Sequence, residues 1–151
     1  MHKKTEEALK IATENFVFRA KTLRGLDNYS ELADNVIEKL SAIGLKADWG
    51  VLGYWSSLYI NVYEVDSIKQ ILPVFEFISK SGLRYLWETE YPDANRTKYD
   101  FGEILVNITF GKNSDCKYIR VGTQKSPVFK FECPEGQKTN VKEHLLNLRR
   151  T

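Results

Sequence analysis

The sequence has few of the residues that enzymes most often use as nucleophiles, bases and metal ligands. Its 151 residues include only two histidines, His2 and His144, and each lies close to an end of the chain. Only two cysteines are present, Cys116 and Cys133, and they lack the paired spacing of zinc ligands. A serine or cysteine nucleophile needs a histidine base beside it in the fold. The sequence therefore argues against a catalytic triad and against a zinc site.

Phosphate-binding glycine motifs and long apolar segments are also missing. Neither a Gly-x-Gly-x-x-Gly motif nor a phosphate-binding loop occurs, so no nucleotide cofactor is indicated. The longest apolar run is far shorter than the roughly 18 residues of a membrane span, and residues 1–7 lack the apolar centre of a signal peptide. We therefore expect a cytoplasmic protein with no cofactor, no metal ion and no membrane association.

The composition fits one domain with a core of its own. Hydrophobic residues make up 42% of the chain, and we expect a single α+β domain over residues 1–151. The formal net charge of +2 is too small to imply a polyanionic partner. The charge is uneven, however, because residues 104–151 carry 9 Lys and Arg against 4 Asp and Glu. The last third of the chain is therefore basic.

The stretch from Leu83 to Cys133 shows the alternation of apolar and polar residues that is typical of β-strands. Turn-forming segments rich in Pro, Gly, Asn and Asp divide it into four runs. The apolar residues on one face are Leu83, Tyr85, Trp87 and Tyr91, then Ile104, Val106, Ile108 and Phe110, then Ile119 and Val121, and finally Phe129 and Phe131. This pattern predicts an antiparallel meander of four strands.

Two cysteines are too few for the disulfide framework of a small secreted protein. Suppose that the apolar residues of the last two strands share one face. The residue numbers of each cross-strand pair then add up to an even number. Cys116 and Cys133 sum to 249, so in this register their side chains point to opposite faces. We therefore expect two free thiols.

Four segments show the three-and-four spacing of apolar residues that is typical of amphipathic helices. They extend from about Thr5 to Arg24, from Ser30 to Ile43, from Asp66 to Gly82, and over a short segment after Asn140. Pro73 must kink or restart the third helix, because proline lacks a backbone donor. The apolar face of the first helix consists of Leu9, Ala12, Phe16, Ala20 and Leu23, and Val17 and Phe18 widen it.

Two short alternating runs, residues 45–49 and 58–65, predict a β-hairpin between the second and third helices. The order of elements predicts an α+β fold with two N-terminal helices, a β-hairpin, a helix and an antiparallel β-meander. We expect the helices to pack on one face of a single sheet, with a short C-terminal helix at the end. The other sheet face is then open to a partner, and whether a second copy closes it stays undecided.

Aromatic residues on the predicted open face are the first candidates for binding. In the run 58–65, apolar residues alternate with Tyr59 and Tyr63, which therefore face away from the core, and Trp55 precedes the run. Tyrosine and tryptophan are enriched in binding hot spots because they combine a large rigid area with a polar tip. We interpret the protein as a non-enzymatic adaptor or inhibitor of another protein, by analogy with phage and mobile-element accessory proteins. The alternative is that these aromatics complete the core.

Nucleic-acid binding is a second interpretation. The outer face of the last hairpin would present Tyr118, Arg120 and Lys130. Aromatic rings can stack on bases while cations neutralise phosphates. The alternative is a mixed, solvated face, because the alternation assigns Glu88 and Glu90 to the same side of the sheet.

A third interpretation starts from Pro92-Asp93 and from Asp115-Cys116-Lys117 further along the chain. Together these segments resemble the Pro-Asp…(Asp/Glu)-x-Lys signature of restriction-endonuclease-like nucleases. The resemblance implies that Asp93 and Asp115 hold a divalent metal and that Lys117 positions or activates the attacking water. Both segments are also ordinary turn sequences, which is the alternative interpretation.

Overall fold

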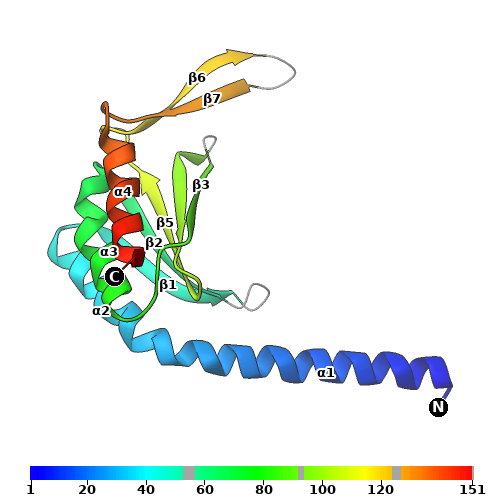
Figure 1. Cartoon of the computed structure of the whole chain (residues 1–151). Helices are drawn as coiled ribbons and strands as arrows, with labels where there is room; N and C mark the ends of the chain where they lie inside the picture. Colours follow the sequence, from blue (N-terminus) through cyan, green and yellow to red (C-terminus); the bar gives the residue numbers. More distant parts are fainter. Residues whose placement is uncertain (53–56, 92–93, 124–126, 151) are drawn as a thin grey trace.

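The computed structural model describes residues 1–52, 57–91, 94–123 and 127–150, and it has the predicted α+β class. Five strands form a mixed sheet: β1 (Lys46–Leu52), β2 (Ser57–Val65), β3 (Trp87–Tyr91), β4 (Arg96–Asp100) and β5 (Ile104–Phe110). Their order across the sheet is β1-β2-β5-β4-β3 (Figure 1). β2 and β5 are parallel neighbours, and the other neighbouring pairs are antiparallel.

Three helices lie on one face of this sheet: α2 (Ser30–Ala42), α3 (Leu72–Lys80) and α4 (Gln137–Arg150) (Figure 1). The 3-10 turn η1 (Asp27–Tyr29) precedes α2, and η2 (Ile68–Ile71) precedes α3. The first helix, α1 (Lys3–Leu26), instead extends away from the sheet and the other helices. Strands β6 (Lys117–Thr123) and β7 (Pro127–Glu132) pair with each other as a separate hairpin. In the described part of the chain, no helix covers the other face of the five-stranded sheet.

The core forms between the sheet and α2, α3 and α4, because the strands alternate buried and more exposed residues. The buried residues of β2 and β5 are Leu58, Ile60, Val62 and Val65, and Ile104, Val106, Ile108 and Phe110. The helices meet them with Ala33, Val36 and Leu40, with Val74, Phe75 and Ile78, and with Val141 and Leu145. The Phe75 ring lies 4.8 Å from the Tyr99 ring and 5.4 Å from the Phe101 ring, measured between centroids. The buried residues of these three helices thus follow the three-and-four spacing that is typical of amphipathic helices.

The helix predicted around Pro73 restarts there. A 3-10 turn leads into α3, and Pro73 occupies the first turn of α3, where a backbone N–H would have no helical acceptor. The hydroxyl of Ser67 caps this segment by accepting from the backbone N–H of Lys69. The last helix begins at Gln137 and is longer than predicted.

The strands differ from the predicted meander in number and in pairing. β4 is missing from the prediction because one of its faces is charged, and it lies between β3 and β5. Leu83 and Tyr85 are buried in the segment that precedes β3, whereas Trp87 at the start of the strand is 57% exposed. Because β6 and β7 leave the main sheet, the predicted single sheet is in fact two sheets.

The register of the β6–β7 hairpin differs from the predicted one and brings the two cysteines together. Ile119 lies opposite Lys130, and Ile119 and Val121 are exposed instead of facing the core. Cys116 and Cys133, whose Cα atoms are 4.1 Å apart, form a disulfide at the base of the hairpin. The prediction of two free thiols is therefore wrong, because it assumed that the apolar residues of both strands share one face.

A buried polar junction anchors the hairpin and α4 to the rest of the fold. The Gln137 side chain is 4% exposed, and its Nε2 donates to the hydroxyl of Ser67 (3.0 Å) and to the carboxylate of Asp115 (2.9 Å). The hydroxyl of Ser114 donates to the backbone carbonyl of Asp66 (2.8 Å). Because the buried side chains of Gln137 and Ser114 have hydrogen-bond partners in other segments, the junction holds three separate segments of the chain in one arrangement.

The apolar face of α1 is not packed against the body. We expected the helices to pack on one face of the sheet, and for this helix the structure differs from that prediction. Every residue from Lys3 to Arg19 is exposed, and Phe16 keeps 72% of its surface accessible. Leu26, at the C-terminal end of α1, is buried. Among the described residues, we find no helix that combines the length and the apolar character needed to cross a membrane.

We expect the oxidised protein to be more stable than the reduced protein by up to about 3 kcal/mol, the chain-entropy value for a loop of this length. The disulfide spans a sequence separation of 17 residues. Urea unfolding with and without a phosphine reductant measures the difference. Full alkylation of both cysteines in the native, unreduced protein would contradict the expected bond.

Candidate functional site

The uncovered sheet face carries the two tyrosines that the sequence predicts for binding. Strand register places three rows of residues on this open face. The rows are Gly50, Tyr59, Leu105, Asp100 and Trp87; then Asp48, Asn61, Asn107, Lys98 and Thr89; and finally Lys46 with Tyr63, and Thr109 with Arg96 and Tyr91. Tyr59 and Tyr63 thus lie on the predicted face, and Trp55 lies outside the described residues. Their role in binding stays a prediction.

A chain of hydrogen bonds crosses the open face from β5 to β1. Asn107 Nδ2 donates to Asn61 Oδ1 (3.1 Å), and Asn61 Nδ2 donates to Asp48 Oδ1 (3.0 Å). The hydroxyl of Tyr63 donates to the second carboxylate oxygen, Asp48 Oδ2 (2.8 Å). Because Asp48 receives both bonds, it fixes the Tyr63 ring beside the edge strand.

The same contact raises the pKa of the Tyr63 phenol. The hydrogen bond to Asp48 raises the pKa of Tyr63 above its ordinary value of 10.0, and loss of solvent and the negative charge of Asp48 act in the same direction. The hydrogen bond with Asn61 acts weakly in the opposite direction. Tyr63 therefore stays a neutral hydroxyl group to a higher pH than an unperturbed tyrosine does.

A glycine in β1 makes room for the second tyrosine. A Cβ atom at position 50 would overlap the hydroxyl end of the Tyr59 side chain. Gly50 lies directly opposite Tyr59 in the β1–β2 ladder. Because Gly50 has no side chain, the Tyr59 ring can lie over the edge strand β1 on the open face.

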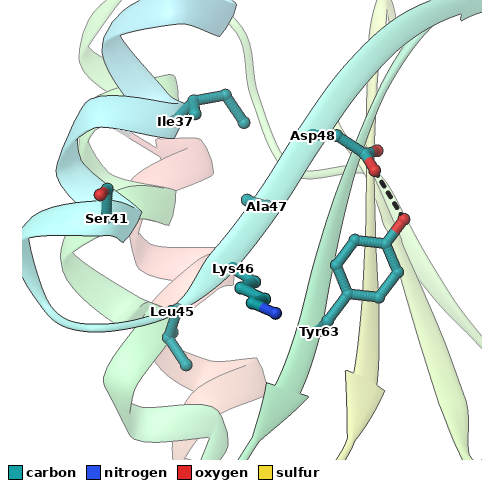
Figure 2. A pocket seen from close by; sticks show the side chains of 7 residues that line it. All are labelled: Ile37, Ser41, Leu45, Lys46, Ala47, Asp48 and Tyr63. Carbon is teal, nitrogen blue, oxygen red and sulfur yellow. Dashed lines mark hydrogen bonds between the residues drawn. The ribbon is translucent and has the colours of Figure 1, made fainter.

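A groove of about 390 Å³ wraps around the outer edge of β1 (Figure 2). Its lining residues come from α2, from β1 and the residue before it, and from β2: Ile37, Ser41, Leu45, Lys46, Ala47, Asp48 and Tyr63. We define these seven residues as the β1 groove. In the described part of the chain no strand pairs with the outer edge of β1, so alternate backbone N–H and C=O groups of this strand lack a strand partner.

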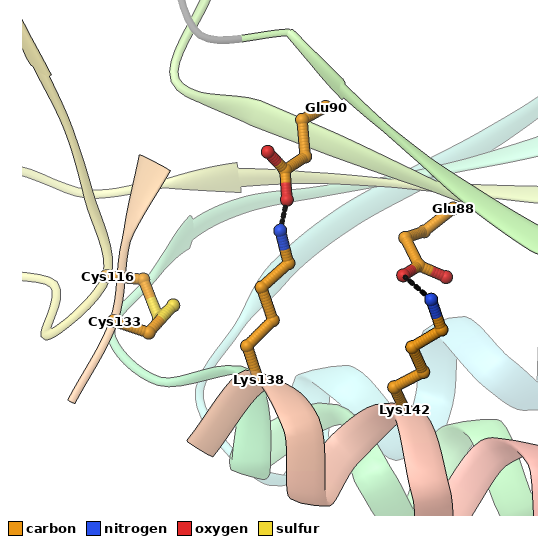
Figure 3. Close-up of polar contacts among 6 residues, drawn as sticks. All are labelled: Glu88, Glu90, Cys116, Cys133, Lys138 and Lys142. Atoms are coloured by element: carbon orange, nitrogen blue, oxygen red, sulfur yellow. Dashed lines mark ion pairs between the residues drawn. A yellow bond between two sulfur atoms is a disulfide. The ribbon is translucent and has the colours of Figure 1, made fainter. Parts of the chain in front are cut away.

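The strand at the opposite edge of the sheet, β3, carries charges on its helix-covered side. Glu88 and Glu90 point to that side, contrary to the prediction, and form ion pairs with Lys142 (3.8 Å) and Lys138 of α4 (Figure 3). Burial lowers the pKa of Lys138, and the charge of Glu88 opposes this change. Inward-pointing charges protect an edge strand from pairing. β1 has no charged residue on its helix-covered side, so its edge lacks this protection.

A second hollow, of about 560 Å³, lies on the open face. Tyr59, Tyr91, Arg96 and Lys98 contribute to its lining, together with Asp100. The guanidinium of Arg96 lies 4.6 Å from the centre of the Tyr91 ring, a cation–π arrangement. The hollow thus combines aromatic rings with cations.

The residues predicted for nucleic-acid binding lie on the β6–β7 hairpin, outside the main sheet. Tyr118 lies opposite Phe131 in the register, whereas Lys130 lies opposite Ile119. The side chain of Lys130 is described, whereas the side chains of Tyr118 and Arg120 lie outside the described part of the structure. Lys130 is exposed and lies 3.7 Å from Glu132. The predicted group of Tyr118, Arg120 and Lys130 therefore stays a prediction.

The residues of the nuclease resemblance do not form a metal site among the described residues. Asp93 lies outside them, Asp115 accepts a hydrogen bond from Gln137, and Lys117 is the first residue of β6. No group of three or more His, Cys, Asp or Glu side chains able to hold a metal ion occurs in the described ranges. Asp115 instead belongs to the buried junction that anchors α4.

Sequence reasoning identified Tyr63 but missed its surroundings. Ile37 and Ser41 belong to a helix that reads as an ordinary amphipathic segment, and Asp48 lies in a short run with no motif. These residues come together because β1 is an edge strand beside α2. The local signal was the alternation of Lys46 and Asp48 with Ala47, which marks a strand but not its place in a sheet.

Comparison with known proteins finds no matching family model, no significantly similar curated protein and no significantly similar solved structure.

We expect Asp48→Asn to lower the pKa of Tyr63 toward 10.0, because the substitution removes the carboxylate that holds the phenol proton. Alkaline titration of the phenolate absorbance measures the pKa of Tyr63. The Tyr63→Phe variant shows which part of the titration belongs to Tyr63 among the eight tyrosines. Since folding raises this pKa, the contact stabilises the fold below about pH 10 and its contribution is lost as the pH rises through the raised value.

Asp34→Asn is the matched control. Asp34 accepts a hydrogen bond from the Trp49 indole on the helix side of β1 and does not touch Tyr63, so the Tyr63 titration should not change. An Asp48→Asn variant in which the pKa of Tyr63 stays as high as in the unsubstituted protein would rule out the proposed cause.

Proposed function

We propose that the protein is a non-enzymatic protein-interaction module that binds an extended segment of another protein along the edge of β1. The observation that carries this proposal is the β1 groove beside the outer edge of the seven-residue strand β1, with which no strand of the described residues pairs. An extended segment that pairs with such an edge gains backbone hydrogen bonds, while pockets beside the edge select its side chains. A stoichiometric adaptor or inhibitor could work in this way.

The two sides of the groove predict the pattern of the bound segment. Side chains of an added strand point alternately to the two faces of the sheet. Those on the helix side would lie against Ile37 and Leu45, which favours apolar residues. Those on the open side would lie beside Lys46 and Asp48, which favours residues of opposite charge at two alternate positions. The segment would cover about seven residues, or roughly 23 Å of extended chain.

The compartment is part of the proposal. The sequence favours the cytoplasm, whereas a disulfide such as Cys116–Cys133 persists mainly in oxidising compartments. Trapping thiols with N-ethylmaleimide at the moment of cell lysis distinguishes the two. A reduced pair supports the cytoplasm, and an oxidised pair supports an oxidising compartment.

Nucleic-acid binding is the second candidate, and the hollow lined by Tyr59, Tyr91, Arg96 and Lys98 is the observation that favours it. Bases could stack on the tyrosines while the cations contact phosphates. Affinity for labelled single-stranded DNA and RNA would then fall steeply with salt and with Lys98→Ala. The protein-binding proposal expects no such affinity.

We expect Ser41→Trp to abolish peptide binding at β1, because the indole would fill the groove. Peptides are selected from a displayed random library against the intact protein, and their affinities are measured by fluorescence anisotropy. Binding should weaken by about tenfold or more in Ser41→Trp. Asn35→Trp, on an exposed part of α2 outside the groove, should bind as the unsubstituted protein does.

Peptide N-methylation tests the backbone pairing itself. Because only one edge of an added strand faces β1, methylating one alternate set of peptide nitrogens should prevent binding and methylating the other set should not. Equal effects of both sets, or selected peptides that bind Ser41→Trp unchanged, would refute strand addition.

A further inference from the structure

α1 is a second surface that the described part of the fold leaves exposed. It contains 24 residues, which corresponds to a length of about 36 Å, and extends from the body in Figure 1. Its exposed large apolar residues are Leu9, Ile11, Phe16, Val17 and Phe18. In most proteins, helix stability comes from packing of an apolar face and not from intrinsic propensity. A helix with this much exposed apolar surface therefore indicates an occupant.

The spacing of one stripe on α1 is that of a coiled coil. Counting from Thr5, steps of four and three residues alternate along the stripe, which contains Thr5, Leu9, Ala12, Phe16, Arg19 and Leu23. This is the alternation of the core positions in a heptad repeat, in which side chains of one helix pack into spaces of another. Such a narrow seam fits a second helix better than it fits a broad sheet face.

We propose that α1 pairs with α1 of a second copy of this chain, in antiparallel orientation. Two-fold pairing then places each Ala12 opposite Phe16 of the second copy, a small residue against a large one. Each Leu9 lies opposite Arg19 of the second copy. The two exposed Phe16 rings would fill the spaces left by the two alanines, which is the size match that close helix packing requires.

The charges of α1 select the antiparallel orientation. A parallel pair would place Arg19 against Arg19 in the seam and bring the basic C-terminal ends of both helices together. In the antiparallel pair, Glu6 lies one helical turn from Arg19 of the second copy, so opposite charges meet. The helix dipoles also oppose each other in the antiparallel arrangement, which is the favourable direction.

The antiparallel pairing separates the points at which the two bodies are attached to the paired helices. Because each body is attached at Leu26, an antiparallel pair places the bodies at opposite ends of a seam that extends over about 28 Å, from Thr5 to Leu23. Aromatic side chains bury roughly 150–250 Å² each, so the two Phe16 residues contribute on the order of 300 Å². With the rest of the seam, the contact reaches the order of 1,000 Å² that a specific interface requires.

Apolar residues outside the seam supply a matched control. Phe18 is two positions from Phe16, or about 200° around the helix, and it lies on the same line as Ile11. Both Phe16 and Phe18 are exposed in a single chain, so a glutamate at either position leaves the folded body intact. Circular dichroism and the urea midpoint verify this.

The first test is the mass of the intact protein in solution, measured by sedimentation equilibrium and light scattering. We expect about twice the 17.5 kDa of one chain. Phe16→Glu should weaken the dimer by roughly 30-fold or more, and Phe18→Glu should leave it unchanged. A monomeric protein, or equal loss in both variants, overturns the proposal. So does a monomer that binds vesicles of phosphatidylcholine and phosphatidylglycerol through α1.

Cysteine cross-linking tests the orientation. Asn15 lies beside the seam. It meets Asn15 of the second copy in an antiparallel pair and does not do so in a parallel pair. Ala12 meets Ala12 of the second copy only in a parallel pair. Oxidation should therefore cross-link Asn15→Cys and not Ala12→Cys, while Cys116 and Cys133 remain bonded to each other. The opposite result overturns the antiparallel pairing, and both tests are independent of the β1 groove.

Discussion

The parallel pairing of β2 with β5 is the constraint on which the rest of the fold depends. Alternate residues from Leu58 to Val62 and from Ile104 to Ile108 are fully buried on one face of this pair. Parallel neighbours cannot be joined by a tight turn, so the chain must cross over the sheet before it returns. The crossover contains α3, which covers the buried face, and then β3 and β4. Because β5 occupies one side of β2, the hairpin partner β1 is left at the edge.

The buried faces of most elements could be predicted from the sequence, but their pairing could not. Burial follows a local period of two or 3.6 residues, which a run such as 58–65 displays directly. Pairing of β2 with β5 joins residues 46 positions apart, such as Asn61 and Asn107, and leaves no local pattern. The hairpin register was wrong for a related reason. An irregularity between Arg120 and Gly122 shifts the pairing by one residue, so aligning the apolar residues gives the wrong partners.

The candidate site, too, could be predicted from the sequence only in part. Tyr63 could be placed on the uncovered face because alternation along β2 is local. The β1 groove could not be predicted, because Ile37, Asp48 and Tyr63 come from three elements and meet only through the order of strands in the sheet. Likewise, the periodicity of α1 predicts an apolar stripe but not its occupant. A stripe that packs on its own sheet and a stripe that packs on a second chain have the same spacing.

The two unpartnered surfaces differ in chemistry, and α2 connects them. The β1 edge offers backbone groups, which accept any extended segment whose side chains suit the groove. In the proposed dimer the α1 seam offers side chains, which require a helix of matching size, and a second copy would supply one by symmetry. α1 ends just before α2, a helix of 13 residues whose Ile37 and Ser41 line the β1 groove. A dimer through α1 would therefore present two grooves on one short scaffold. A partner with two binding segments would then bind more tightly than either groove alone allows, because its second segment binds at a high effective concentration.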